Sequence, residues 1–67
     1  MSVFSSAKFA IQFASKNKIK KGYIVVHPDG DCVQVSIPEK YAISKFYSVF
    51  EIEYNEDTET FRAIEMN

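Results

Sequence analysis

The stretch from Tyr23 to Ile37, YIVVHPDGDCVQVSI, decides the fold of this chain. Two β-rich runs, Tyr23–Val26 and Cys32–Ile37, flank a short segment of turn-forming residues. In that segment Pro, Asp and Gly follow one another, which is typical of a type I turn with a glycine bulge. We therefore predict a β-hairpin whose three-residue loop pairs Val26 with Cys32 and holds Gly30 at positive φ.

The register of this hairpin determines which of its faces is buried. With the three-residue loop, the odd-numbered residues of both strands share one face, which we take as the core side. A loop of two or four residues would shift the pairing by one and turn Ile24 and Val26 inward instead. The predicted core face is Tyr23, Val25, Val33, Val35 and Ile37; we expect Val33, Val35, Ile37 and Ile11 to be buried, with Gln34 and Ser36 facing outward.

A helix is predicted before the hairpin, from about Ser5 to Asn17, because apolar residues recur there at helical spacing. Phe9 and Phe13 stand four residues apart at the edge of the apolar stripe and widen it beyond what a surface helix needs. The stripe itself consists of Phe4, Ala7, Ile11 and Ala14, with Val3 and Ala10 beside them.

Three further elements are predicted after the hairpin. Pro38–Ser44 begins with Pro and Glu, which favours a short helical turn, although alternation from Tyr41 to Val49 would also suit a strand. A strand is expected over Phe46–Tyr54, then a polar loop, then a last strand over Thr60–Met66. One face of this second hairpin is predicted to hold Phe50, Ile52, Tyr54, Phe61 and Ala63, with Arg62 opposite Glu51 or Glu53 on the other.

The predicted fold is therefore α+β in a single small domain, residues 1–67. An N-terminal helix packs on an antiparallel sheet of about four strands, formed by two β-hairpins with a short helical turn between them. We find no internal repeat, linker or low-complexity segment.

Size and composition restrict how so small a domain is stabilised. Domains of 67 residues usually need disulfides, a metal or self-association. Cys32 is the one cysteine and His27 the one histidine, so an internal disulfide is excluded and a structural zinc site, which needs about four ligands, is not expected. The chain is 46% hydrophobic and 15% aromatic, which is rich for so little interior and favours self-association or docking on another protein.

Cellular location and membrane association follow from the same composition. A lone cysteine suits a reducing compartment, so we expect a cytoplasmic protein. No apolar run approaches the roughly 20 residues of a membrane span, so no membrane association is expected. No cofactor motif and no small-molecule substrate site are evident.

The net charge of −1 conceals a steep gradient along the chain. Residues 1–22 carry five lysines and no acid, whereas residues 46–67 carry six acids against Arg62. The sequence is therefore a charge dipole, and two copies could meet with their opposite ends facing, as a two-fold dimer would allow.

The segment His27–Cys32 is the one place where reactive side chains gather. A Cys–His nucleophile and base pair would need both groups on one face, but the predicted register points His27 and Cys32 to opposite faces. Asp29 and Asp31 resemble the start of a calcium loop, yet the remaining ligands are missing. We interpret the segment as an ordinary hairpin turn, and we do not expect an enzyme.

Two charged groups are candidate binding surfaces. The basic end of the predicted helix could bind a phosphate backbone, with an aromatic residue stacking on bases. The acidic C-terminal half should repel that backbone, or complement a basic patch on another protein. The basic group is Lys16, Lys18, Lys20 and Lys21; the acidic face is Glu51, Glu53, Glu56 and Asp57.

The aromatic surplus provides the third candidate surface. Phe9 and Phe13, with Lys16 beneath them, would form a ridge for a partner if they are exposed; the alternative is that both belong to the core. We predict a protein-interaction module, such as a small regulator, inhibitor or accessory subunit, that binds another protein or forms a homodimer. The alternative is a nucleic-acid-binding protein that uses the basic end of the helix.

Overall fold

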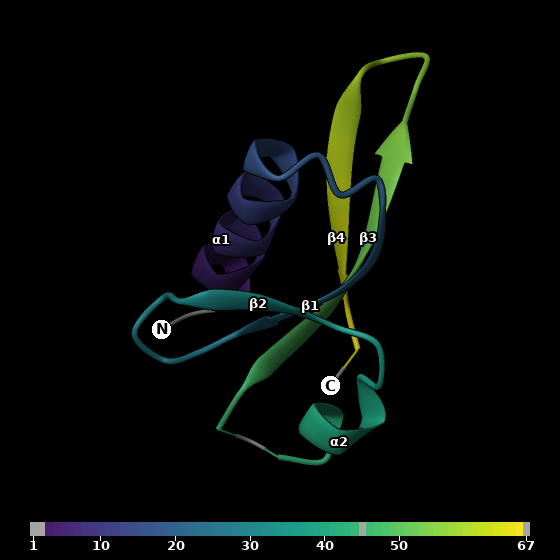
Figure 1. The fold of residues 1–67 in the computed structure, drawn as a ribbon. Helices are drawn as coiled ribbons and strands as arrows, with labels where there is room; N and C mark the ends of the chain where they lie inside the picture. Colours follow the sequence, from purple (N-terminus) through teal and green to yellow (C-terminus); the bar gives the residue numbers. More distant parts are fainter. Residues whose placement is uncertain (1–2, 45, 67) are drawn as a thin grey trace.

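The fold is α+β, as the sequence predicts (Figure 1). The computed structural model describes residues 3–44 and 46–66, with side chains from Ser6 onward. Its elements in chain order are α1 (Val3–Lys16), β1 (Lys21–Val26), β2 (Cys32–Val35), α2 (Glu39–Ala42), β3 (Ser48–Asn55) and β4 (Thr60–Glu65).

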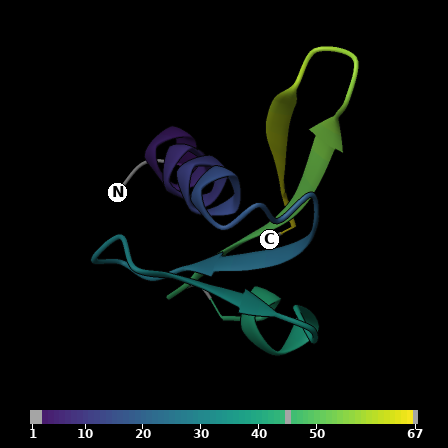
Figure 2. The ribbon, with the colours of Figure 1, turned by 45° about the horizontal axis from the view of Figure 1, so that its top comes forward.

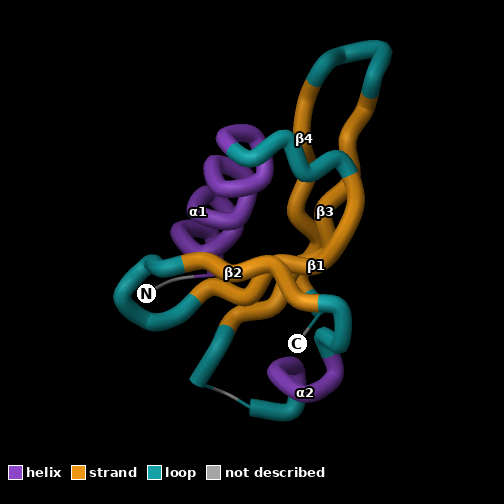
Figure 3. Tube along the Cα trace, in the orientation of Figure 1, coloured by secondary structure: helices purple, strands orange, loops and turns teal. Residues whose placement is uncertain are grey.

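The four strands form one antiparallel sheet in the order β2-β1-β3-β4. The two hairpins are joined by pairing of β1 with β3, which sets Ile24 opposite Phe50. Between them, the chain leaves β2, forms α2 and returns on the other side of β1 (Figure 3). The two central strands, β1 and β3, are therefore paired on both edges, and β2 and β4 are the edge strands.

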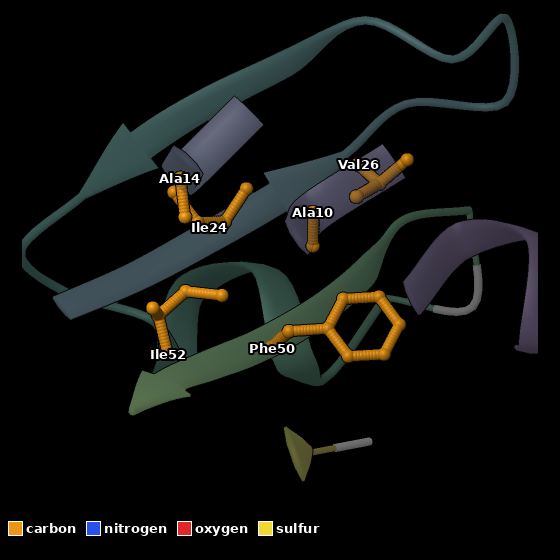
Figure 4. Close-up of a cluster of buried hydrophobic side chains, with 6 residues drawn as sticks. All are labelled: Ala10, Ala14, Ile24, Val26, Phe50 and Ile52. Carbon is orange, nitrogen blue, oxygen red and sulfur yellow. The ribbon is translucent and has the colours of Figure 1, made fainter. Parts of the chain in front are cut away.

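Helix α1 lies on one face of the sheet, and the β3–β4 hairpin rises beside it (Figure 2). Two buried alanines, Ala10 and Ala14, let the helix approach the strands closely. Short α2 lies on the opposite side of the sheet (Figure 1). Figure 4 shows the resulting core, which consists of Ala10, Ala14, Ile24, Val26, Phe50 and Ile52.

The predicted register of the first hairpin is confirmed, but its predicted core face is wrong. Val26 pairs with Cys32 and Gly30 has φ +95°, as expected of the three-residue loop. It is nevertheless Ile24 and Val26 that face α1. The cause is the pairing with β3, because Phe50 lies opposite Ile24 and the largest core side chain is thereby placed on the even-numbered face.

The burial of individual residues differs from the prediction in the same way. Val33 and Ile37 are exposed instead of buried, whereas Val35 and Ile11 are half-buried. Gln34 and Ser36 are exposed, as predicted. Val25 is fully buried although it faces away from α1, because its strand is central and α2 and its flanking loops lie on that side.

The remaining elements agree closely with the prediction. Helix α2 follows Pro38, and the pairings of the second hairpin set Ile52 against Ala63 and Tyr54 against Phe61. Strand β2 is shorter than expected and ends at Val35. In α1, Ala10 and Ala14 are buried as predicted; the side chains of Val3 and Phe4, also placed on the apolar stripe, lie outside the described residues. Neither helix in residues 3–44 and 46–66 has the length and apolar character needed to cross a membrane.

Candidate interaction surface

Large apolar side chains are exposed on the side of the sheet that carries α2. Val33 and Ile37, from β2 and the residues after it, are 41% and 55% exposed. Ile43 at the end of α2 is 86% exposed, and Phe46 in the loop to β3 is 65% exposed. We call these four residues the α2-side surface. None of them belongs to the hydrophobic core cluster, and each exposes apolar area that a partner could bury.

A group of aromatic rings fixes the position of this surface. The ring of Tyr47 is met edge-on by those of His27, Tyr41 and Phe46, with centroid distances of 5.0, 5.5 and 5.1 Å. Edge-to-face contacts of this kind are favourable beyond the area that they bury. They connect the β1–β2 turn, α2 and the loop before β3, so the exposed Phe46 ring is supported by its neighbours.

A surface pocket of about 260 Å³ has Ile37, one of the four exposed residues, in its lining. It lies where β2 ends and α2 begins, so residues from an edge strand and from a helix border the same space. Lys40 is its one charged lining residue among those described. The lining residues are Gln34, Val35, Ser36, Ile37, Lys40 and Tyr41.

The predicted aromatic ridge on α1 is divided between core and surface. Phe13 is half-buried and packs against the core, whereas Phe9 is 38% exposed. The Phe9 ring lies over the β1–β2 turn, close to Gly30. Lys16 is exposed in the last turn of the helix. Part of the Phe9 ring therefore packs on the hairpin. The α2-side residues expose a larger apolar area to a partner than Phe9 does.

The basic and acidic groups predicted from the sequence lie at the same end of the molecule. Lys21 of β1 is directly opposite Glu53 of β3. The Lys20 ammonium lies 5.0 Å from the centroid of the Tyr54 ring, a cation–π distance. The gradient along the sequence is therefore largely cancelled in space, because the pairing of β1 with β3 brings the basic segment beside the acidic one.

Three of the four acidic residues, Glu53, Glu56 and Asp57, lie at or near the turn of the β3–β4 hairpin. Glu53 accepts a hydrogen bond from Arg62 at 2.7 Å, while Glu51 lies opposite Ile64. Glu56 and Asp57 lie in the turn, and with Glu53 and Arg62 they line an open hollow of about 620 Å³. One acid of the predicted face is thus already paired, and the group does not form one continuous surface.

The His27–Cys32 turn is built as the sequence indicates. Cys32 packs against the core on the α1 side, whereas the His27 ring contacts Tyr47 on the other. The His27 Nδ1 atom is 3.2 Å from the backbone oxygen of Asp31. Burial, with a smaller effect from the Asp31 carboxylate, raises the pKa of the Cys32 thiol. The two side chains are therefore not a nucleophile and its base, and the raised pKa disfavours the thiolate.

No metal-binding arrangement of three or more His, Cys, Asp or Glu side chains occurs within the described part of the chain. Comparisons with protein-family models, with curated proteins and with solved structures find no match for this chain.

Sequence reasoning missed most of the α2-side surface. Val33 and Ile37 were assigned to the core because they alternate correctly within one hairpin. The sequence did contain a signal for Ile43 and Phe46. Both are large apolar residues that stand alone in a short helical turn or a loop, where no regular element carries them into the core.

Proposed function

We propose that this chain is a protein-interaction module, acting as a small regulator, inhibitor or accessory subunit that occupies the surface of a partner protein. The observation that supports this proposal is the α2-side surface, with Ile43 86% and Phe46 65% exposed. Exposed apolar groups of this size are costly in water, and their burial is the main source of affinity in protein interfaces. Aromatic anchors such as Phe46 are typical of the residues that dominate such interfaces.

One of the two anchors, Phe46, is held in place by neighbouring groups. Phe46 is braced against Tyr47, and its backbone N–H donates to the Ser44 hydroxyl at 3.1 Å. A side chain that is already positioned loses less conformational entropy when it is buried in a complex. The proposal therefore places the binding energy in Ile43 and Phe46 and assigns a supporting role to the neighbouring pocket.

Nucleic-acid binding through Lys16, Lys18, Lys20 and Lys21 remains the alternative function, and no feature of the geometry favours it. A phosphate backbone that reached Lys21 would also meet the Glu53 carboxylate beside it, and this repulsion opposes binding. This alternative predicts affinity that falls steeply with salt concentration.

The test compares the same substitution on the two sides of the sheet. The tagged wild-type chain, Phe46→Ser and Phe9→Ser are used as baits in lysate of the native host, with and without nuclease, after circular dichroism has shown that each is folded. We expect a nuclease-resistant protein partner that Phe9→Ser retains and Phe46→Ser loses. Nuclease-sensitive capture that salt removes would support the lysine alternative, and equal capture by all three chains would refute the role of the α2-side surface.

A further inference from the structure

The outer edge of β2 is an unpaired strand edge within the described part of the chain. In the β1–β2 hairpin the His27 N–H donates to the Asp31 carbonyl at 2.8 Å. Hydrogen-bonded and non-hydrogen-bonded pairs alternate along an antiparallel ladder, so Val33 and Val35 also bond to β1. The N–H and C=O groups of Cys32 and Gln34 consequently point outward, where they are ready to pair with another strand.

We propose that a second copy of this chain pairs with this edge, antiparallel and about a two-fold axis at Gln34. The inference goes beyond the proposed function, because it concerns the edge of β2 and not the anchors Ile43 and Phe46. With a two-fold axis perpendicular to the sheet, the face that carries α1 in one copy continues into the same face of the other. Odd-numbered residues must therefore pair with odd-numbered ones, and even-numbered with even-numbered. Pairing about Gln34 sets Val33 opposite Val35 of the second copy, and the same contact occurs twice. Pairing about Val33 would instead set Val35 against Asp31 of the second copy.

The charges at the two ends of β2 complement one another in this arrangement. Continued past the end of β2 at Val35, the same register directs Asp31, at the hairpin turn, towards Ile37 of the second copy. Ile37 shares its pocket with Lys40, so the Asp31 carboxylate of one copy approaches the Lys40 ammonium of the other. Two such pairs form by symmetry, and Val33 of each copy gains an apolar neighbour, Val35 of the second copy.

The other edge strand is less suited to self-pairing. The Met66 N–H donates to the Val49 carbonyl at 2.9 Å, so by the same alternation the outward groups of β4 belong to Phe61, Ala63 and Glu65. Pairing about Ala63 would set Phe61 against Glu65 of the second copy, and α1 already packs against β4 (Figure 2). The dimer through β2 is therefore a continuous eight-stranded sheet with both copies of α1 on one face.

Engineered cysteines test the register directly, with purified protein and mild oxidation. Residues directly opposite in a hydrogen-bonded antiparallel pair have Cα atoms about 5.5 Å apart, a distance that a disulfide can bridge. In a Cys32→Ser background, Gln34→Cys should give a disulfide-linked dimer. In that background Ser36→Cys should give no such dimer, because position 36 of one copy lies roughly 13 Å along the strands from position 36 of the other.

Sedimentation without oxidant provides the second measurement. The wild type should sediment as a dimer at micromolar concentration. Val33→Lys, which puts a charge into the paired face, should raise the dimer Kd at least about tenfold. Thr60→Lys on the edge strand β4 is the matched control and should leave the dimer intact.

The outcomes separate this inference from the proposed function. A monomeric wild type, or equal cross-linking of the Gln34 and Ser36 variants in the Cys32→Ser background, would overturn the β2 dimer. If a monomeric wild type still captures a protein that Phe46→Ser loses, the interaction function holds and this inference fails alone, because Ile43 and Phe46 lie outside the paired edge.

Discussion

The ring of Phe9 in α1 lies against Gly30 in the β1–β2 turn, 3.4 Å from the point where a Cβ atom on that glycine would stand. Gly30 also has φ +95°, a conformation that side chains with a Cβ rarely adopt. The helix and the hairpin tip therefore meet at a position where both backbone and space favour glycine.

Gly30→Val should lower the free energy of unfolding by more than about 1 kcal/mol, because the turn becomes strained. Urea denaturation measures the change. The same substitution in a Phe9→Ala background separates the two causes: backbone strain persists there, whereas crowding against the ring disappears. A Gly30→Val protein as stable as the wild type would contradict the assigned turn.

Val26→Ala and Val33→Ala form a matched pair for the buried face of the hairpin. Val26 is 2% exposed and belongs to the core, whereas Val33 is among the exposed residues. Val26→Ala should lower the free energy of unfolding by about 2–3 kcal/mol, and Val33→Ala should lower it by less than about 1 kcal/mol. Denaturant unfolding of the monomer, with dimer formation excluded by dilution, gives both values; the reverse order would restore the odd-numbered face as the core.

The ion pair between Glu53 and Arg62 should contribute little to stability. Its side chains are 50% and 71% exposed, so water and salt screen their attraction. A double-mutant cycle with Glu53→Gln and Arg62→Gln should give a coupling energy of about 0.2–1 kcal/mol. High salt should reduce that coupling, and a large coupling that salt leaves unchanged would refute the assignment.

Cys32 should react slowly with alkylating reagents. Its thiol pKa is raised above the ordinary 9.0 by burial and by Asp31, so less thiolate is present at a given pH. The folded protein also holds the thiol proton more tightly than the unfolded chain. Stability relative to Cys32→Ser should therefore be constant at neutral pH and fall as the pH rises above about 9.

The rate of iodoacetamide modification as a function of pH measures this pKa. Unfolded protein in urea is the control and should react faster at every pH below the thiol pKa. A folded thiol that reacts as fast as the unfolded one at pH 8 would contradict the burial of Cys32.

Local chemistry determined the elements and the strand pairing within each hairpin. The Pro–Asp–Gly turn fixed the pairing of Val26 with Cys32, and Pro38 fixed the start of α2. The mutual faces of β3 and β4 followed from the alternation of their residues, including Arg62 opposite Glu53. These features depend on residues that are close in sequence, so a local pattern is sufficient to specify them.

Long-range pairing decided the rest. Either face of the first hairpin could be buried, since both carry β-branched residues; the pairing of Ile24 with Phe50 selected one and left Val33 and Ile37 exposed. The same pairing set Lys21 against Glu53 and cancelled the charge gradient along the sequence. The sequence by itself thus determined the elements and their turns, whereas the buried face and the exposed surface required the β1–β3 contact, because only that contact brings residues far apart in the chain onto a common face.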